Sequence, residues 1–285
     1  PRTFSVELKQ GSITSQEHSG RCWMFASLNT LRYELMHKWN LDDFEFSESY
    51  LFFYDKLEKS NFYLENVLKT LDKTTDSRIF EAVNEGPADD GGWWQMFVAL
   101  VKKYGLVPKE AYPESSNSRD SSAFEQYLNT KLREFAAELR DAHQAGKSVE
   151  ELRSLKTGQM SVVYRICAIA MGEPPASFDL LLRVKDDAKA SESCTKSGID
   201  SRRQIVEHGI TPQEFYAKYV GKDLDDFVSL TNSPLASTPY YRRYQLAFVG
   251  NVAEAAPMDF INVPLDVFRK AAVDQLTAGH PIWFA

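Results

Sequence analysis

The feature that most constrains this fold is a cysteine placed where a turn meets a long helical pattern. Residues 15–32 read SQEHSGRCWMFASLNTLR, and apolar side chains recur at spacings of three and four residues from Cys22 to Trp39. This spacing predicts a helix with one buried face, beginning just after the Ser-Gly pair. We therefore expect Cys22 to lie in the first turn of a helix.

That position suits a nucleophile. The unpaired backbone N–H groups and the dipole at a helix N-terminus favour negative charge, so a thiol there ionises more readily than a free thiol. A thiolate that attacks a carbonyl creates an oxyanion, which needs fixed hydrogen-bond donors. The backbone N–H of Cys22 and the side-chain amide of Gln16 could supply two. Cys22 and Gln16 are the candidate catalytic residues; the alternative for Cys22 is a small buried side chain.

Further elements follow along the chain. Helices are predicted at 46–71, with Ser47 as N-cap, and at 93–105, ending at Gly105. Residues 106–122 form a connector rich in proline and serine. Three later predictions are a mainly helical stretch from 123 to about 230, a loop at 181–202 and a helix begun by Thr211 and Pro212. Alternating patterns in residues 240–264 and in the final HPIWFA predict strands.

Composition excludes several classes of protein. The net charge of −7 argues against nucleic acid or anionic lipid as the main partner. No signal-peptide pattern and no apolar run of about 18 residues is present, so we expect a cytoplasmic protein that does not span a membrane. The three cysteines have no paired spacing, and there is no HExxH motif or Cys/His cluster. We expect neither a metal nor a cofactor.

The sequence around Cys22 resembles a known family. GRCWMFASLNTLR, with Gln16 six residues before Cys22, is similar to the active-site segment of papain-like cysteine peptidases of the bleomycin hydrolase and aminopeptidase C family. FEFSESYLFFYDKLEKSNFYLENVL (44–68) and DDGGWWQMFVALVKKYGLVPKEAYPE (89–114) look like later segments of that family. The similarity is dense over residues 5–115, looser over 116–210, and recovers in GITPQEFYAKYV and GHPIWF.

The resemblance implies an α+β fold of the papain-like cysteine peptidase type. A helical left domain with the nucleophile helix would occupy residues 1–115, and a mainly helical insertion residues 116–235. Residues 236–285 would begin an antiparallel β-barrel right domain, incomplete in this chain. The family also implies peptide substrates and a homohexamer with its active sites facing an inner cavity.

A second cluster is expected to bind the substrate backbone. An extended peptide can pair with the backbone only where no side chain intrudes, so Gly91 and Gly92 would line the cleft. Asp90 and Trp23 complete the predicted substrate-binding set. Without the resemblance, the Asp-Gly pair would be read as an ordinary turn.

The proton-transfer partner of Cys22 is not found in the sequence. A cysteine peptidase needs a histidine and usually an Asn or Asp that orients it. None of the five histidines stands in the motif that the family uses, and we expect that histidine and asparagine in a missing C-terminal portion. The sequence thus predicts a cysteine aminopeptidase acting through a Cys22 acyl-enzyme. The alternatives are an inactive fragment or scaffold subunit of the same fold, and an endopeptidase without the family's C-terminal blocking arm.

Overall fold

The first half of the chain is helical. The computed structural model describes residues 3–185 and 203–284. The elements of this half are α1 (Cys22–Lys38), α2 (Glu48–Lys69), α3 (Arg78–Asn84), α4 (Trp94–Tyr104), a 3-10 turn (Lys109–Ala111) and α5 (Ser116–Arg119). Three predictions are confirmed here: α1 begins at Cys22, the Ser47 hydroxyl accepts the Tyr50 N–H at 3.0 Å to cap α2, and α4 ends before Gly105.

Gly105 stops α4 for a steric reason. Its φ is +72°, in the left-handed region that favours glycine. A Cβ atom at this position would lie 2.3 Å from the backbone of Pro212. Glycine therefore lets the end of α4 pack directly against α9 (Pro212–Phe215), which Thr211 caps as predicted.

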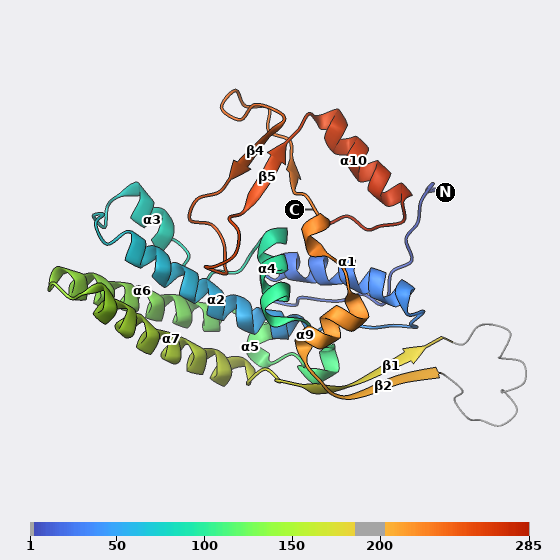
Figure 1. Ribbon diagram of the computed structural model, residues 1–285, viewed down its shortest axis with the longest axis horizontal. Helices are drawn as coiled ribbons and strands as arrows, with labels where there is room; N and C mark the ends of the chain where they lie inside the picture. The colour runs from blue at the N-terminus through green and yellow to red at the C-terminus, as the bar shows by residue number, and fades with distance from the viewer. Residues whose placement is uncertain (1–2, 186–202, 285) are drawn as a thin grey trace, which may run out of the picture.

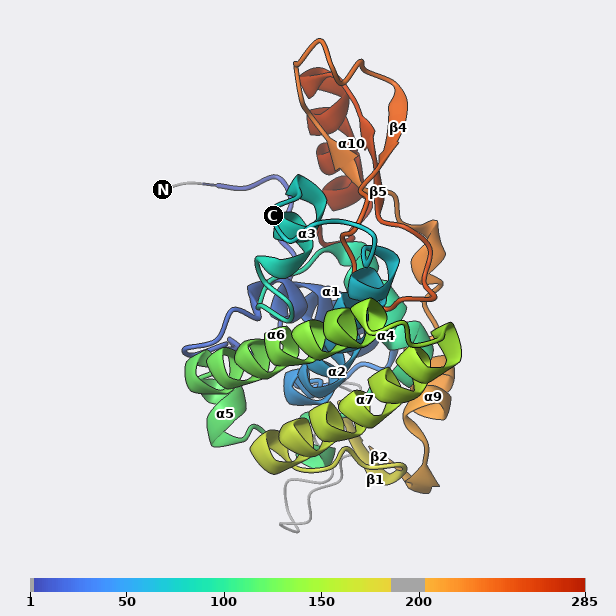
Figure 2. The ribbon, with the colours of Figure 1, turned by 90° about the vertical axis from the view of Figure 1, so that its left-hand side faces the viewer.

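The middle of the chain is a helical hairpin followed by a β-hairpin. Helices α6 (Ser122–Gln144) and α7 (Val149–Met171) lie side by side and pack against α2 (Figures 1 and 2). Strands β1 (Phe178–Val184) and β2 (Arg203–Ile210) then pair antiparallel. The prediction of a mainly helical stretch up to residue 230 is therefore wrong for this hairpin.

The reason lies in the pattern of β1. Leu180 and Leu182 are buried while Leu181 is half exposed, which is the alternation of a strand. A run of three apolar residues, Leu180 to Leu182, does not by itself distinguish a strand from a buried helix. The predicted loop began at residue 181, four residues too early; residues 186–202, including Cys194, lie outside the described residues. His208 lies in β2.

The last part carries a small mixed sheet. After α9 come a π-helical turn (Tyr216–Val220), a 3-10 turn (Leu224–Asp226), β3 (Leu230–Thr231), β4 (Arg242–Gln245), β5 (Asp259–Asn262) and α10 (Leu265–Thr277). The sheet order is β3-β5-β4, with β5 antiparallel to β4 and parallel to β3. The strands predicted within 240–264 are confirmed as β4 and β5. The predicted terminal strand is wrong, because residues 281–284 form none and α10 precedes them.

One hydrophobic core joins the helical body to the β1–β2 hairpin. It includes apolar side chains from α1, α2, α4, α6 and α7. The β3–β5 sheet and α10 stand apart from this body (Figure 2), and α10 has no buried residue. Among the helices of the described ranges, none is both long and apolar enough to cross a membrane. The described strands form no closed barrel.

Candidate active site

Cys22 is the first residue of α1, and its side chain is exposed. The residue before it, Arg21, makes no side-chain capping hydrogen bond to the helix. The N–H groups of the first helical turn are thus free of a capping side chain, and they form the positive end of the helix dipole. The sulfur is open to a substrate at a position that favours a thiolate.

The segment before Cys22, residues 16–21, is called here the nucleophile loop. The Gln16 side-chain amide donates to the Ser19 carbonyl at 2.5 Å, and the Ser19 hydroxyl donates back to the Gln16 carbonyl at 2.7 Å. An amide nitrogen carries two N–H donors, so one remains for another acceptor. Within the described chain, no hydrogen bond joins Gln16 to Cys22.

Arg21 anchors the other end of the nucleophile loop. It is 1% exposed, and its Nη1 lies 2.9 Å from Oε1 of Glu114. Its Nε donates to the Ser19 hydroxyl at 2.7 Å, and its guanidinium carbon lies 5.1 Å from the centre of the Phe25 ring. A buried guanidinium needs such partners, because an unpaired buried charge is costly. Arg21 therefore ties the loop to the helical core.

The predicted Gly-Gly pair lies against the nucleophile loop. Residues 88–92 are called here the wall segment. The N–H of Gly91 donates to the Gly20 carbonyl at 3.2 Å, and Gly91 has a φ of +92°. A Cβ atom on Gly91 would meet nothing within 4 Å, so the backbone of the wall segment is open on that side. The structure thus brings Gly91 next to the loop that carries Gln16.

Trp23 supports the wall segment from beneath. It is 5% exposed, and a Cβ atom on Gly92 would lie 2.6 Å from its ring. The indole therefore fills the space beside Gly92 rather than offering a free face. Trp23 was predicted to bind substrate; its burial leaves it only an indirect part, through Gly92. The indole N–H of Trp283 reaches the Trp23 carbonyl at 3.2 Å, so residues 281–284 pass close to the start of α1.

Asp90 connects the wall segment to the nucleophile loop. Its Oδ2 accepts the N–H of Gly20 at 2.5 Å and the hydroxyl of Ser121 at 2.7 Å. Its Oδ1 lies 2.7 Å from Nζ of Lys56, which also pairs with Glu125. Asp90 is thus engaged with other groups of the protein.

The pKa values of the two carboxyl groups in this cluster are shifted in opposite directions. Burial raises the pKa of Glu125 to about 8, and its hydrogen bond to Asp90 acts in the same direction. Burial also acts to raise the pKa of Asp90, but the hydrogen bond from Glu125 and the Lys56 ammonium outweigh it and hold that pKa well below its usual range. These opposite shifts favour the carboxylate form of Asp90 and the protonated form of Glu125.

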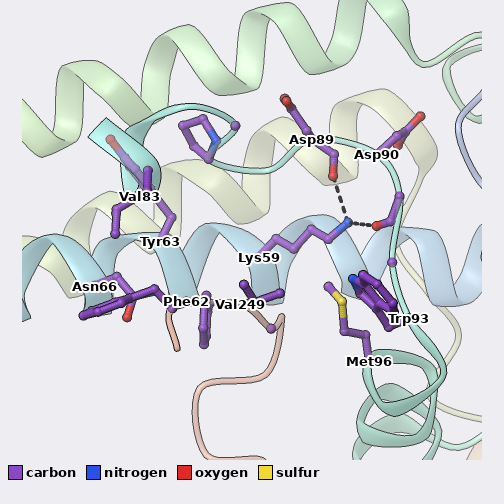
Figure 3. Close-up of a pocket in the computed structure, with 17 residues that line it drawn as sticks. Lys59, Phe62, Tyr63, Asn66, Val83, Asp89, Asp90, Trp93, Met96 and Val249 are labelled. Carbon is purple, nitrogen blue, oxygen red and sulfur yellow. Dashed lines mark hydrogen bonds between the residues drawn. The ribbon is translucent and has the colours of Figure 1, made fainter. Parts of the chain in front are cut away.

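A second lysine fixes the wall segment from α2. Nζ of Lys59 donates to the carbonyls of Asp89 at 2.8 Å and Gly91 at 2.6 Å (Figure 3), and Nζ of Lys56 donates to the Ala88 carbonyl at 2.7 Å. Burial lowers the pKa of Lys59, against the opposing effect of Asp55. The two lysines, three residues apart, hold carbonyl groups along the wall segment.

A cavity of about 340 Å³ borders the wall segment on this side. Figure 3 shows its lining from α2, α3, α4 and the chain before β5. The apolar part of the lining includes Phe62, Tyr63, Val83, Met96 and Val249. The half-buried Gly91 and Gly92 thus take part in lining a pocket whose walls are both polar and apolar.

The described histidines do not reach Cys22. All five lie in the described residues, and none shares a hydrogen bond with Cys22. Nδ1 of His280 lies 2.6 Å from Oε1 of Glu34, and Nδ1 of His37 lies 2.7 Å from the Tyr33 carbonyl. The described residues also contain no cluster of His, Cys, Asp and Glu able to hold a metal ion.

Comparison with known proteins identifies the family. The whole chain, residues 1–285, matches the model described as the peptidase C1-like family. The chain belongs to the peptidase C1-like family. This membership confirms the resemblance drawn from the residues around Cys22.

Named relatives agree with this assignment. The chain is 39% identical over 282 residues to an aminopeptidase C of Lactobacillus delbrueckii subsp. lactis and 40% identical over 281 residues to one of Streptococcus thermophilus. Each match covers 99% of this chain and 60% of the relative. The crystal structure of PepW from Lactobacillus rhamnosis HN001 matches with a TM-score of 0.91 and 39% identity, over 98% of this chain and 59% of that one. These matches confirm the papain-like α+β fold, and the chain spans about 60% of its relatives' length.

Sequence reasoning missed the charged side chains around this peptidase C1-like site. Four residues were not singled out: Arg21, Lys56, Lys59 and Glu125. Arg21 belongs to the nucleophile loop, the two lysines contact the wall segment, and Glu125 pairs with Lys56. One signal was present: α2 is rich in buried aromatic side chains, yet it carries two lysines three residues apart. Charges on a helix buried on most sides require partners, and such partners mark a functional site as often as a structural one.

Proposed function

We propose that this chain carries the nucleophile side of a cysteine aminopeptidase that removes N-terminal residues from peptides. The single observation that carries the proposal is the exposed Cys22 at the uncapped start of α1, beside a nucleophile loop bonded to Gly91. The relatives called aminopeptidase C support the choice of peptide N-termini. The site formed around Cys22 is expected to act on the peptide bond that follows the N-terminal residue of the substrate.

The proposed reaction proceeds through an acyl-enzyme. The Cys22 thiolate attacks the carbonyl carbon, the amine product leaves with a proton, and water then hydrolyses the thioester. The backbone N–H of Cys22 and the second amide N–H of Gln16 would stabilise the oxyanion. Gly91 and Gly92 would pair with the substrate backbone. The proposal assigns the general base, and the residue that orients it, to the part of the relatives that this chain does not span.

The nucleophile is tested first. Chloroacetamide at limiting concentration should modify Cys22 far faster than Cys167 or Cys194, and a Cys22→Ser variant should lose the fast phase. Peptide mapping by mass spectrometry identifies the labelled residue. Equal, slow labelling of all three cysteines would rule out an activated thiolate and, with it, the peptidase.

A second reading is a non-catalytic subunit of the same fold, which binds peptides or serves assembly. It is favoured by one observation: none of the five described histidines is bonded to Cys22. Aminoacyl-coumarin hydrolysis separates the two, because a scaffold leaves the substrate intact even when Cys22 is labelled selectively.

Specificity and assembly complete the proposal. An endopeptidase would instead cleave a peptide whose N-terminus is blocked, whereas an aminopeptidase requires a free amine. The family resemblance further supports a homohexamer, which sedimentation velocity would distinguish from a monomer.

A further inference from the structure

The strongest unexplained feature is the buried charged cluster that joins the wall segment to the nucleophile loop. Lys56 is fully buried and is shared between Asp90 and Glu125. Removing such charges from water costs several kcal/mol per ion in order of magnitude, which hydrogen bonds and pairing must offset. A cluster of this kind beside the nucleophile calls for an explanation in terms of the site.

Both oxygens of Asp90 are engaged within the protein. An ionised carboxylate offers about four lone-pair sites. The N–H of Gly20 and the hydroxyl of Ser121 donate to Oδ2, and the Lys56 ammonium pairs with Oδ1. Its function therefore acts through these neighbours rather than on a substrate.

The contact with Gly20 is the one that reaches the nucleophile. Gly20 lies two residues before Cys22, within the nucleophile loop. A Cβ atom on residue 20 would lie 2.5 Å from the Asp90 Cβ, so only glycine allows this approach. The Gly20 carbonyl accepts the Gly91 N–H at 3.2 Å, so both the N–H and the carbonyl of Gly20 are bonded to the wall segment.

We propose that Asp90 is a positioning residue. Its carboxylate, held by Lys56, accepts the Gly20 N–H and so fixes the conformation of the nucleophile loop. That conformation places the Gln16 amide and the Cys22 N–H where they can donate to an oxyanion. The inference rests on the proposed function of Cys22. The Gly20 N–H needs an acceptor at the place of Oδ2, and the contacts of Asp90 with Ser121 and Lys56 hold that acceptor there. Oxyanion donors stabilise charge well only when they are held in place beforehand.

Two substitutions of Asp90 separate the effect of the position of its acceptor oxygen from the effect of its negative charge. Asp90→Asn removes the charge but keeps an oxygen where Oδ2 accepts the Gly20 N–H, and Glu125 can then ionise to pair with Lys56. Asp90→Glu keeps the charge but moves the acceptor by one methylene group. Leu152→Ala, a buried truncation in α7, is the control for loss of stability alone. If Asp90→Glu does not fold, Asp90→Ala, which removes the acceptor altogether, takes its place.

The readout is binding rather than turnover. A short peptide aldehyde forms a hemithioacetal with Cys22 and places an oxygen at the oxyanion position, whereas the corresponding peptide alcohol reports only contacts with the wall segment. We expect Asp90→Glu to weaken aldehyde binding about tenfold or more relative to the alcohol, and Asp90→Asn to retain most of it. The control Leu152→Ala should leave the ratio of aldehyde binding to alcohol binding unchanged. Chloroacetamide should label Cys22 at nearly the unaltered rate in all variants.

The outcomes are distinguishable. Equal aldehyde-to-alcohol ratios in the unaltered protein and in the Glu or Ala variant would overturn the positioning role while leaving the nucleophile intact. A larger loss for Asn than for Glu would also overturn it, since charge and not acceptor position would then matter. If the unaltered chain neither binds the aldehyde nor labels selectively at Cys22, the proposed function itself fails.

Discussion

Gly92 is the most exacting position in the wall segment, and Gly92→Ala tests it. The added Cβ atom would lie 2.6, 2.7 and 2.9 Å from three ring carbons of Trp23. Ordinary contact between carbon atoms begins at about 3.5 Å, so the ring or the wall segment must move by nearly 1 Å.

The indole cannot yield easily. Trp23 is 5% exposed, its carbonyl accepts the Trp283 indole N–H, and Nζ of Lys59 lies 5.5 Å from the ring centre. Overpacking of a filled core costs about 1–3 kcal/mol. We therefore expect Gly92→Ala to lower the free energy of unfolding by about 2 kcal/mol and to weaken binding of a peptide alcohol, because the wall segment is displaced.

Urea unfolding followed by tryptophan fluorescence measures the first effect, and calorimetric titration with the peptide alcohol measures the second. Gly158→Ala is the matched control: it lies within α7, a Cβ atom there meets nothing within 4 Å, and we expect a gain of up to about 1 kcal/mol from helix propensity. A Gly92→Ala protein as stable as the unaltered one would refute the packing of Trp23 under Gly92. Unchanged peptide binding at reduced stability would refute the role of Gly92 in the cleft.

Three further predictions follow from buried groups. Cys167 is fully buried, and burial raises the pKa of its thiol to about 12. Alkylation of the folded protein at pH 8 should therefore label Cys22 and leave Cys167 unmodified. Comparable labelling rates of the two in a mass-spectrometric time course would contradict the fold around α7. Arg21→Met should cost about 3–5 kcal/mol in urea unfolding, because it leaves Glu114 charged and unpaired; a loss below about 1 kcal/mol would show that the ion pair is dispensable. Burial raises the pKa of Glu48 to about 8 in the folded protein. As pH rises from about 5 to 8, this carboxyl ionises in the unfolded chain but stays protonated in the folded one. The free energy of unfolding should therefore fall by on the order of 1 kcal/mol per pH unit over this range. In Glu48→Gln that part of the slope should vanish, and parallel stability–pH curves for the two proteins would disprove it.

The predictions that the structure confirmed depend on short-range signals. Ser47 caps α2, Gly105 ends α4, and Thr211 with Pro212 begins α9, each through contacts within a few residues or through an allowed φ angle. Cys22 at the first position of α1 belongs to the same class. Such features can be read from neighbouring letters because the backbone groups that they satisfy are themselves neighbours.

The errors occurred where pairing partners are distant. β1 and β2 were predicted as helix and loop, because a short apolar run is compatible with either state until a partner strand supplies its hydrogen bonds. β3 pairs in parallel with β5 through residues 31 positions apart along the chain, and no local pattern encodes that register.

The amino-acid sequence alone determined that a cysteine begins a buried helix, that a glutamine precedes it, and that two glycines open a backbone further on. Only the tertiary structure showed how these parts are held together. Asp90 meets Gly20 across 70 positions of chain and Lys56 meets Glu125 across 69. Helix starts and turns follow from local backbone chemistry, whereas the partner of a buried charge depends on which distant groups the packed core brings within hydrogen-bond range.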